Sequence, residues 1–584
     1  MSVGGSKILR TYREGYARDN ALTRYWQQRD CTLSGKVRQQ EGFGTAAKRS
    51  VLVCACLAVL ASPVRAEKPL AVGDMPGALP TIGTISITNN DIFDMGKPDE
   101  NRALYRMANR LHVRTRPDVI RQQLLFNVGD SYSRQAIDES ERILRSNRYI
   151  QEVSLRPVPR EDGTVDIDVT TSDVWTLMPK LSFSKAGGAT NTAIGIKEMN
   201  VLGSGVAVEA MFKSNVDRDS TVLKIVDRNL GQSWYRLATS IAQNSDGHEY
   251  GLDIGKPFYA LNSTDALGLS FLDADRIETF YDRGEVASDV RHQGRDMEML
   301  FGRSRGLENG WARRLTFGAG VSDHSYMDSG STDPELFPMM QDRRLVYPFV
   351  GLEIIEDRYD KASNLDQIHR VEDRFLGTRA SARVGLAREE FGSDRNAWLL
   401  DLHAQTGFGN SERSSLLLAA DATTRVESDG PQNLQFGVSA KYYKRQSERR
   451  LLFVGLSGTY GHNPDLDQYL QLGGDNGLRG YPVRFQSGDK RAVLTVEQRL
   501  FTDWNPFSLF RVGAAAFFDV GRTWGASPLS EASDTWLSDV GFGLRVGSAR
   551  SGLGRMIHFD VAFPLSGQEY IDDIQFLIST HKSF

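Results

Sequence analysis

Residues 472–524 are the stretch that decides the fold, and they read LGGDNGLRGYPVRFQSGDKRAVLTVEQRLFTDWNPFSLFRVGAAAFFDVGRTW. The stretch begins with a Gly-rich loop that has Arg479 at its centre, and two runs of alternating polar and apolar residues follow. A period of two indicates β-strands whose two faces meet different surroundings. A soluble β-sandwich gives a similar pattern, so the surroundings have to be inferred from the whole chain.

Both runs place their charged residues on one face. In the first run, one face carries Arg491, Val493, Thr495, Glu497 and Arg499, and the other carries Ala492, Leu494, Val496, Gln498 and Leu500. In the second run, Arg511, Gly513, Ala515, Phe517, Asp519 and Gly521 oppose Val512, Ala514, Ala516, Phe518 and Val520. We therefore predict that Glu497 and Asp519 lie on the polar faces of their strands.

The longest apolar run of the chain, residues 51–61, has the features of a secretory signal peptide. It follows Lys48 and Arg49 and precedes the sequence SPVRA, which ends at Ala66. A short basic region, an apolar core and a Val-x-Ala end predict that residues 1–66 are an N-terminal extension and signal peptide, cleaved after Ala66. A buried strand or helix is the alternative. All three cysteines precede this site, so we expect neither disulfides nor thiolate metal sites in the mature chain.

Hydropathy and charge exclude two classes of protein. No apolar run approaches the roughly 18 residues that a membrane-spanning helix needs. The formal net charge is −4, and residues 1–66 contribute +7, so the remaining residues carry −11. An acidic protein is a poor candidate for binding nucleic acid.

The N-terminal part of the mature chain predicts a small α+β domain. We expect residues 67–80 to be a linker and residues 81–172 to form the domain. Its strands are expected at 81–89, 152–157 and 165–170, and its helices at 118–126 and 134–147, the second of them capped by Ser133. Such a domain can bind an extended partner by strand addition, or it can merely hold the following domain in register.

Residues 173–584 predict a transmembrane antiparallel β-barrel in the outer membrane. The helical period disappears there, and short alternating runs recur between turns such as Glu308-Asn309-Gly310. Near the end, Val540, Phe542, Leu544 and Val546 face away from Asp539, Gly541, Gly543 and Arg545, and the chain closes on Phe584. A secretory signal, a long all-strand region, a polar inner face and a terminal aromatic residue all favour this environment.

Two motifs in this region resemble those of a known family, the BamA/TamA-type outer-membrane assembly and translocation barrels. LRGY at residues 478–481 is similar to the signature of the family's sixth extracellular loop, which folds back into the lumen. FFDVG at residues 517–521 is similar to the Phe-x-Asp-x-Gly signature of the barrel wall. Residues 81–170 resemble one periplasmic POTRA domain. The resemblance implies a mainly β protein with a barrel of sixteen strands and a lumen loop around residues 464–488.

The resemblance also implies roles for individual residues. In the family, the loop arginine meets inward-facing acids, so Arg479 is expected to pair with Asp519 and with Glu497. Leu478, Gly480 and Tyr481 complete the loop motif, Phe517 and Gly521 complete the wall motif, and Phe584 is the C-terminal barrel signal. A solvated loop arginine is the alternative for Arg479. A buried cation requires such partners, because an unpaired buried charge costs several kcal/mol.

The number of strands can also be counted from the sequence. Five alternating runs follow the Arg479 loop, and up to fifteen precede it, with possible extra hairpins within 286–327 and 396–426. We expect sixteen strands, as in the family. Both ends of the barrel domain should lie in the periplasm, so the number has to be even. A single POTRA-like domain makes a general role in barrel assembly doubtful.

Signals for catalysis or metal binding are poor. Gly302-x-Ser304-x-Gly306 lacks the strand–turn–helix context of a nucleophile elbow. His558 and Asp560 share an inward face without a suitable serine, and the Asp465–Asn476 loop reads as an acidic solvated loop. We expect no enzyme, no metal and no cofactor. The resemblance implies an outer-membrane protein that assembles or translocates an unfolded or extended client polypeptide, in contact with outer-membrane lipid and possible accessory proteins. A passive pore or structural barrel is the alternative, and a barrel-bound hydrolase is a distant third.

Overall fold

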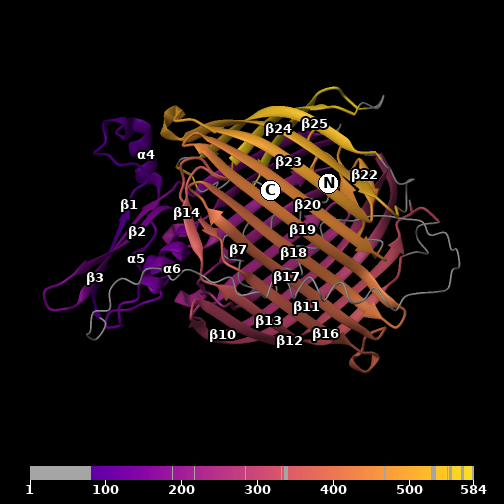
Figure 1. Cartoon of the computed structure of the whole chain (residues 1–584), viewed down its shortest axis with the longest axis horizontal. Helices are drawn as coiled ribbons and strands as arrows, with labels where there is room; N and C mark the ends of the chain where they lie inside the picture. Colours follow the sequence, from indigo (N-terminus) through magenta and orange to yellow (C-terminus); the bar gives the residue numbers. More distant parts are fainter. Residues whose placement is uncertain are drawn as a thin grey trace.

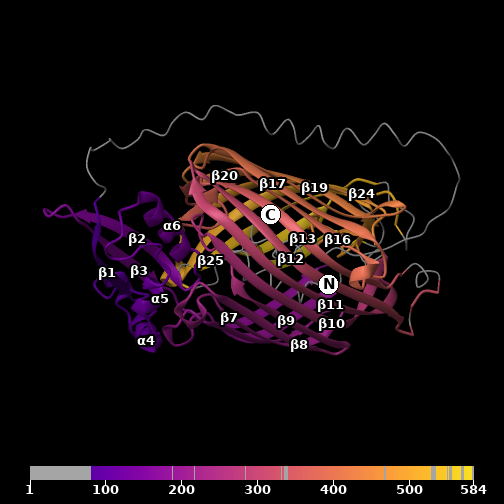
Figure 2. The same cartoon turned by 90° about the horizontal axis from the view of Figure 1, so that it is seen from below.

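The chain folds into a large β-barrel with a small α+β domain at one of its ends (Figures 1 and 2). The structure is a computed structural model. It describes residues 80–584, apart from gaps at 187–188, 216, 283–284, 331, 335–339, 466–467, 528–534, 549, 552–555, 567–570 and 582–584. The predicted signal peptide with its cleavage site, nearly all of the predicted linker, and Phe584 lie outside the described residues.

The N-terminal domain contains a three-stranded sheet in the order β1-β3-β2. Strand β1 (Ile82–Asn90) runs parallel to β3 (Val165–Asp173), and β2 (Ile150–Pro159) runs antiparallel to it. The three predicted strands are therefore present, each slightly longer than expected. Because β3 is central, β1 and β2 are the edge strands of the sheet.

Three α-helices accompany the sheet, and none of the described helices is long and apolar enough to cross a membrane. They are α4 (Ala103–Leu111), α5 (Pro117–Arg121) and α6 (Arg134–Arg145). Helix α6 begins where predicted, because the Ser133 side chain accepts a hydrogen bond from the Ala136 backbone N–H. The predicted helix over residues 118–126 is shorter than expected and ends at Arg121.

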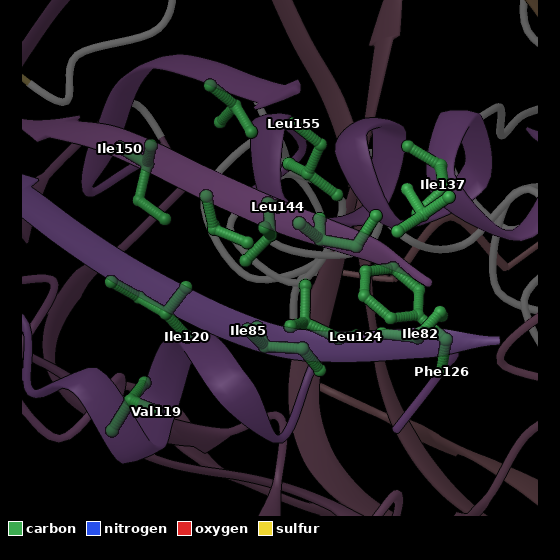
Figure 3. Close-up of a cluster of buried hydrophobic side chains, with 14 of the residues drawn as sticks. Ile82, Ile85, Val119, Ile120, Leu124, Phe126, Ile137, Leu144, Ile150 and Leu155 are labelled. Carbon is green, nitrogen blue, oxygen red and sulfur yellow. The ribbon is translucent and has the colours of Figure 1, made fainter. Parts of the chain in front are cut away.

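The core of the domain lies between α5, α6 and the sheet (Figure 3). Ile120, Leu144, Ile150 and Ile167 are fully buried there. Leu124 and Phe126 reach the same cluster from the connection that replaces the second half of the predicted helix. These apolar contacts, rather than the propensity of two short helices, hold the domain together.

The barrel consists of twenty described strands, which form a closed ring. Its first ten strands are β4 (Leu177–Ala186), β5 (Ala189–Glu198), β6 (Ala207–Ser214), β7 (Asp219–Asp227), β8 (Arg236–Asn244), β9 (Gly247–Lys256), β10 (Asp265–Asp282), β11 (Glu285–Glu308), β12 (Trp311–Asp328) and β13 (Arg343–Glu356). The other ten are β16 (Arg379–Ala387), β17 (Ala397–Asn410), β18 (Ser414–Glu427), β19 (Gly430–Ser447), β20 (Arg450–His462), β23 (Lys490–Phe501), β24 (Phe510–Trp524), β25 (Leu537–Ser548), β26 (Met556–Pro564) and β27 (Gln575–His581). Strand β27 lies beside β4 and closes the ring.

The expected number of sixteen strands is wrong. Fifteen barrel strands precede the Arg479 loop, which is the upper limit of the count of alternating runs, and five follow it. The possible extra hairpins within 286–327 and 396–426 are real strand pairs, β11–β12 and β17–β18. The family's usual strand number was therefore a poorer guide than the alternation of this sequence.

The outer wall of the barrel is apolar and the inner face is polar. Exposed apolar side chains recur at every second residue, as in Leu267 and Leu269 of β10, Met297, Met299 and Phe301 of β11, Leu315 and Phe317 of β12, and Val350, Leu352 and Ile354 of β13. Inward-facing Glu298, Arg314 and Arg383 are buried and paired with opposite charges. This is the pattern of a barrel whose wall faces lipid.

The N-terminal domain lies across one end of the barrel, which we call the near end; the opposite end is the far end (Figure 1). Residues of the domain hydrogen-bond to six of the connections between strands at the near end. The bonded residues of these connections are Asn200 and Gly203 after β5, Arg228 after β7, Leu261 after β9, Asp357 and Asp373 after β13, Phe507 after β23, and Arg550 after β25. The domain is therefore fixed to the barrel mouth rather than tethered by the β3–β4 connection alone.

We expect Leu144→Ala to lower the free energy of unfolding of the N-terminal domain by about 2–5 kcal/mol, because it leaves a cavity at a fully buried position. Hydrogen exchange of β3 amides in the whole protein measures this change. Val128→Ala is the control, since Val128 is 58% exposed and its truncation should change the free energy of unfolding by less than about 0.5 kcal/mol. Equal β3 exchange rates in the two variants would contradict the assignment of this core.

Candidate functional site

The loop that connects β20 to β23 returns into the barrel interior from the far end. We call residues 463–489 the far-end loop; they include the short strands β21 (Leu470–Leu472) and β22 (Gln486–Gly488), which pair with each other. Its apolar side chains are buried against inward-facing residues of the wall. The cluster comprises Leu472, Leu478, Tyr481, Phe485, Val493, Leu537 and Ile571.

Arg479 lies at the tip of this loop, among acidic side chains of the barrel wall. Its Nε and Nη2 donate to the two carboxylate oxygens of Asp519 at 2.6 and 3.0 Å, and its Nη1 donates to Glu497 Oε1 at 2.8 Å. The guanidinium carbon lies 3.4 Å from the centroid of the Phe517 ring. Arg479 thus makes a bidentate contact with a carboxylate and stacks on an aromatic ring. Both contacts depend on the planar guanidinium group, which lysine lacks.

Further charges extend this contact into a network. Arg499 donates to Glu497 Oε2 at 2.9 Å, and Arg545 pairs with both Glu497 and Asp560. Asp560 lies 3.7 Å from Arg479 Nη1. Three arginines and three acids thus alternate in space within the lumen, so that each buried charge has an opposite charge beside it.

The other residues of the two motifs fix the position of the loop. The Gly480 backbone N–H donates to Asp539 at 3.0 Å, and a Cβ at Gly480 would lie 2.6 Å from the Asp539 Cβ. Only glycine allows the backbone to approach the wall so closely. The Tyr481 hydroxyl donates to the Ser538 carbonyl at 2.9 Å, and Leu478 is fully buried.

The structure thus brings together eight of the nine residues expected at the site. Leu478, Arg479, Gly480 and Tyr481 come from the far-end loop, and Glu497, Phe517, Asp519 and Gly521 come from the inner faces of β23 and β24. The ninth, Phe584, lies outside the described residues. Four members of the network were missed: Arg499, Asp539, Arg545 and Asp560. The alternation had already placed all four of these residues on the polar or inward faces of their strands, and this phase was the available signal.

A second segment enters the lumen from the near end, and sequence analysis did not predict it. We call residues 357–378 the near-end hairpin; they include β14 (Tyr359–Ala362) and β15 (Glu372–Phe375). Leu365 and Ile368 at its tip are buried against Tyr443, Phe453 and Phe501 of the wall. The tip is therefore packed inside the barrel.

Hydrogen bonds fix the conformation of this tip. The Glu372 carboxylate accepts from the backbone N–H groups of Leu365 and Gln367 at 3.1 and 3.2 Å. Burial, followed by the neighbouring carboxylate of Asp366, raises the pKa of Glu372 to about 7. The base of the hairpin contacts α6 of the N-terminal domain, where Arg145 donates to Asp373 at 2.7 Å.

Arg499 of β23 links the near-end hairpin to the far-end loop through Glu497. Its Nη1 donates to Asp366 of the hairpin at 3.0 Å, while its Nε donates to Glu497, the partner of Arg479. Polar contacts therefore run from α6 of the N-terminal domain through the near-end hairpin to the far-end loop. The two segments occupy the lumen from opposite ends.

Two of the polar residues that were considered as cation ligands, Asp465 and Asn476, have other partners in the structure. Asp465 is partly buried and pairs with Arg425 at 2.9 Å and with Arg343 at 3.0 Å, so the expectation of a solvated acidic loop is wrong at this residue. Asn476 binds the backbone of its own loop, and Asp467 lies outside the described residues. Among the residues that the structure describes, no group of three or more His, Cys, Asp or Glu side chains is arranged to hold a metal ion.

The solved structures that match the chain include CdiB and BamA. CdiB from Escherichia coli is 12% identical, with a TM-score of 0.45 over 92% of this chain and 99% of that chain. BamA from Haemophilus ducreyi, lacking POTRA domains 1–3, is 11% identical, with a TM-score of 0.38 over 85% of each chain. No curated protein sequence matches the chain.

Sequence families give the stronger assignment. Residues 379–581 match the Omp85 superfamily domain, which covers the second half of the barrel and the far-end loop. Residues 112–172 match the surface antigen variable number repeat, a POTRA domain, which covers most of the N-terminal domain. The chain therefore carries an Omp85 superfamily domain in the second half of its barrel and a POTRA domain ahead of the barrel.

Proposed function

We propose that the protein lies in the bacterial outer membrane, with its POTRA domain in the periplasm, and assembles or translocates client polypeptides into or across that membrane. Members of the Omp85 superfamily are outer-membrane barrels that handle polypeptides and are not enzymes. The observation that carries the proposal is the attachment of a POTRA domain to a barrel whose lumen contains two inserted segments of the same chain. A purely structural barrel has no need of two segments inserted into its lumen.

Capture of the client is assigned to the POTRA sheet. Strands β1 and β2 are its edges, and an extended polypeptide can bind an edge strand by backbone hydrogen bonds. In β2, Pro157 and Pro159 have no backbone N–H, so they weaken that end of the edge. Within β2, we therefore expect a client to bind along residues 150–156 rather than along residues 157–159.

Passage of the client is assigned to the barrel, by its lumen or its wall, and the folding of the client supplies the free energy. The far-end loop is held by Arg479, and the near-end hairpin is held by Asp366, Leu365 and Ile368. In the structure both segments lie in the lumen, so a client that uses the lumen has to displace them. A passive pore is the second candidate, because inward charges line the barrel wall.

Arg479→Ala should lower the stability of the barrel and the delivery of clients. It leaves Glu497 and Asp519 buried without their shared cation, and removal of one partner of a buried ion pair costs about 3–5 kcal/mol. The temperature at which the barrel loses its folded mobility in detergent gels measures the effect. Arg449→Ala is the control, because the Arg449–Asp503 pair is exposed, and Arg479→Lys should be intermediate. If Arg479→Ala unfolded at the same temperature as Arg449→Ala, the proposed role of Arg479 would be refuted.

Replacing residues 363–371 with a Gly-Ser linker of equal length should raise the single-channel conductance of the purified protein in planar bilayers. The linker removes Leu365, Asp366 and Ile368 from the lumen but keeps the contact between Arg145 and Asp373. The matched control replaces residues 388–396, nine residues that connect β16 to β17 at the far end. Equal conductance of the two variants would show that the near-end hairpin does not close the lumen.

Deletion of the gene should remove one or a few outer-membrane or surface proteins from the outer-membrane proteome. Expression of the wild-type chain should restore them, whereas a chain without residues 81–172 should not. Restoration by the truncated chain would assign the POTRA domain a purely structural role. An unchanged proteome after deletion would favour the passive pore.

A further inference from the structure

We propose that helix α4 lies in the headgroup region of the adjacent membrane leaflet and binds anionic phospholipid there, so that it anchors the POTRA domain to the bilayer. The inference rests on the proposed position of the barrel in the outer membrane. It concerns a surface that takes no part in the lumen network.

Helix α4 exposes an apolar stripe. Leu104, Met107 and Leu111 are spaced at i, i+3 and i+7, which places them on one face of the helix. Their exposed fractions are 56%, 53% and 64%. The described part of the chain does not cover this stripe, although three large apolar side chains in a row on a nine-residue helix are costly to leave in water.

The opposite side of α4 is packed firmly against the barrel mouth. Tyr105 is buried and stacks on Phe93, with 4.4 Å between ring centroids, and Trp175 and Leu509 pack against the same cluster. The Tyr105 hydroxyl also donates to the carbonyl of Phe507, in the connection between β23 and β24. The direction of the apolar stripe is therefore fixed relative to the barrel.

The barrel rim beside α4 exposes aromatic side chains of its own. Trp504 and Phe507 in the β23–β24 connection are 64% and 72% exposed, and Phe510 at the start of β24 is 40% exposed. Exposed aromatic residues at the end of a lipid-facing wall are typical of the membrane–water interface. Because Phe507 contacts Tyr105, α4 is held beside this aromatic rim.

The charges of α4 fit an anionic lipid surface. Residues 101–117 contain five arginines and no acidic residue. Arg102, Arg106 and Arg110 recur at every fourth residue and are exposed, and they lie on a face of α4 different from the apolar stripe. Apolar side chains on one face and arginines on another are the pattern of a helix that lies in a bilayer interface and attracts anionic headgroups.

The short length of α4 does not argue against this role. An isolated nine-residue helix is marginally stable and binds membranes weakly. In this protein the helix is already formed and held beside the bilayer by the barrel, so the entropic cost of bringing it to the membrane has been met by barrel insertion. Burial of the three stripe side chains in the bilayer, with a few contacts between arginines and headgroups, then suffices to hold α4 at the membrane.

The test places a polarity-sensitive fluorophore on Met107→Cys in the full chain, with Cys31, Cys54 and Cys56 replaced by serine. The protein is reconstituted in vesicles of phosphatidylethanolamine and phosphatidylglycerol mixed three to one, with brominated phospholipid as the quencher. Leu500→Cys, on the outer wall of β23, is the reference for lipid contact, and Val158→Cys, on β2, is the reference for water. We expect the Met107 probe to be quenched and blue-shifted like the Leu500 probe. With Arg106→Glu and Arg110→Glu added, the Met107 signal should move to that of Val158.

Resistance of the barrel to heating in detergent gels confirms insertion in the same samples. If the barrel is inserted and the Met107 probe behaves like the Val158 probe, the inference is overturned while the proposed function stands. Protection of the Met107 probe in cells but not in the vesicles would also overturn it, and would assign the stripe to a protein partner. Loss of clients on gene deletion tests the proposed function independently of either result.

Discussion

Charge buried within the barrel is the constraint on which the architecture depends. Arg479 cannot lie in the lumen without acids at its side, because moving an ion out of water costs several kcal/mol unless partners replace the lost hydration. Glu497 and Asp519 supply two carboxylates on adjacent strands, and Arg499 and Arg545 prevent Glu497 from becoming an excess negative charge. The same contacts specify strand register, since a shift of one residue would turn these acids toward lipid.

The second constraint is the connection between the two ends of the barrel. Arg499 binds Glu497 of its own strand and Asp366 of the near-end hairpin. The base of that hairpin is bound to α6 through Arg145, and α6 belongs to the domain assigned to client capture. Displacement of the hairpin therefore removes an acidic partner from Arg499 and changes the electrostatic surroundings of Glu497, which Arg479 shares. Client binding at the POTRA domain can therefore alter the ion pairs that hold the far-end loop, if it moves the near-end hairpin.

Sequence reasoning was strongest where a local pattern repeats. Alternation over residues 490–524 placed Glu497 and Asp519 on the inner faces of β23 and β24. The upper limit of the count of alternating runs agrees with the twenty strands observed, whereas the sixteen strands predicted from the family do not. It failed for the near-end hairpin, whose conformation depends on Tyr443 and Arg499, respectively 77 and 133 residues from Asp366. The local sequence of residues 357–378 does not predict contacts with such distant residues.

The composition of the lumen network has a consequence for the order in which the protein folds. Apart from the hairpin's Asp366, the partners of Arg479, Arg499 and Arg545 in the ionic network belong to β23, β24 and β26, and Gly480 binds β25, so the loop and its binding surface are neighbours along the chain. Contacts between neighbouring segments require little loss of chain entropy and can form early. The C-terminal sheet can thus take up its loop while β4 and β27 are still apart. The barrel then closes around a plug that is already in place, and no polypeptide has to be threaded through a finished ring.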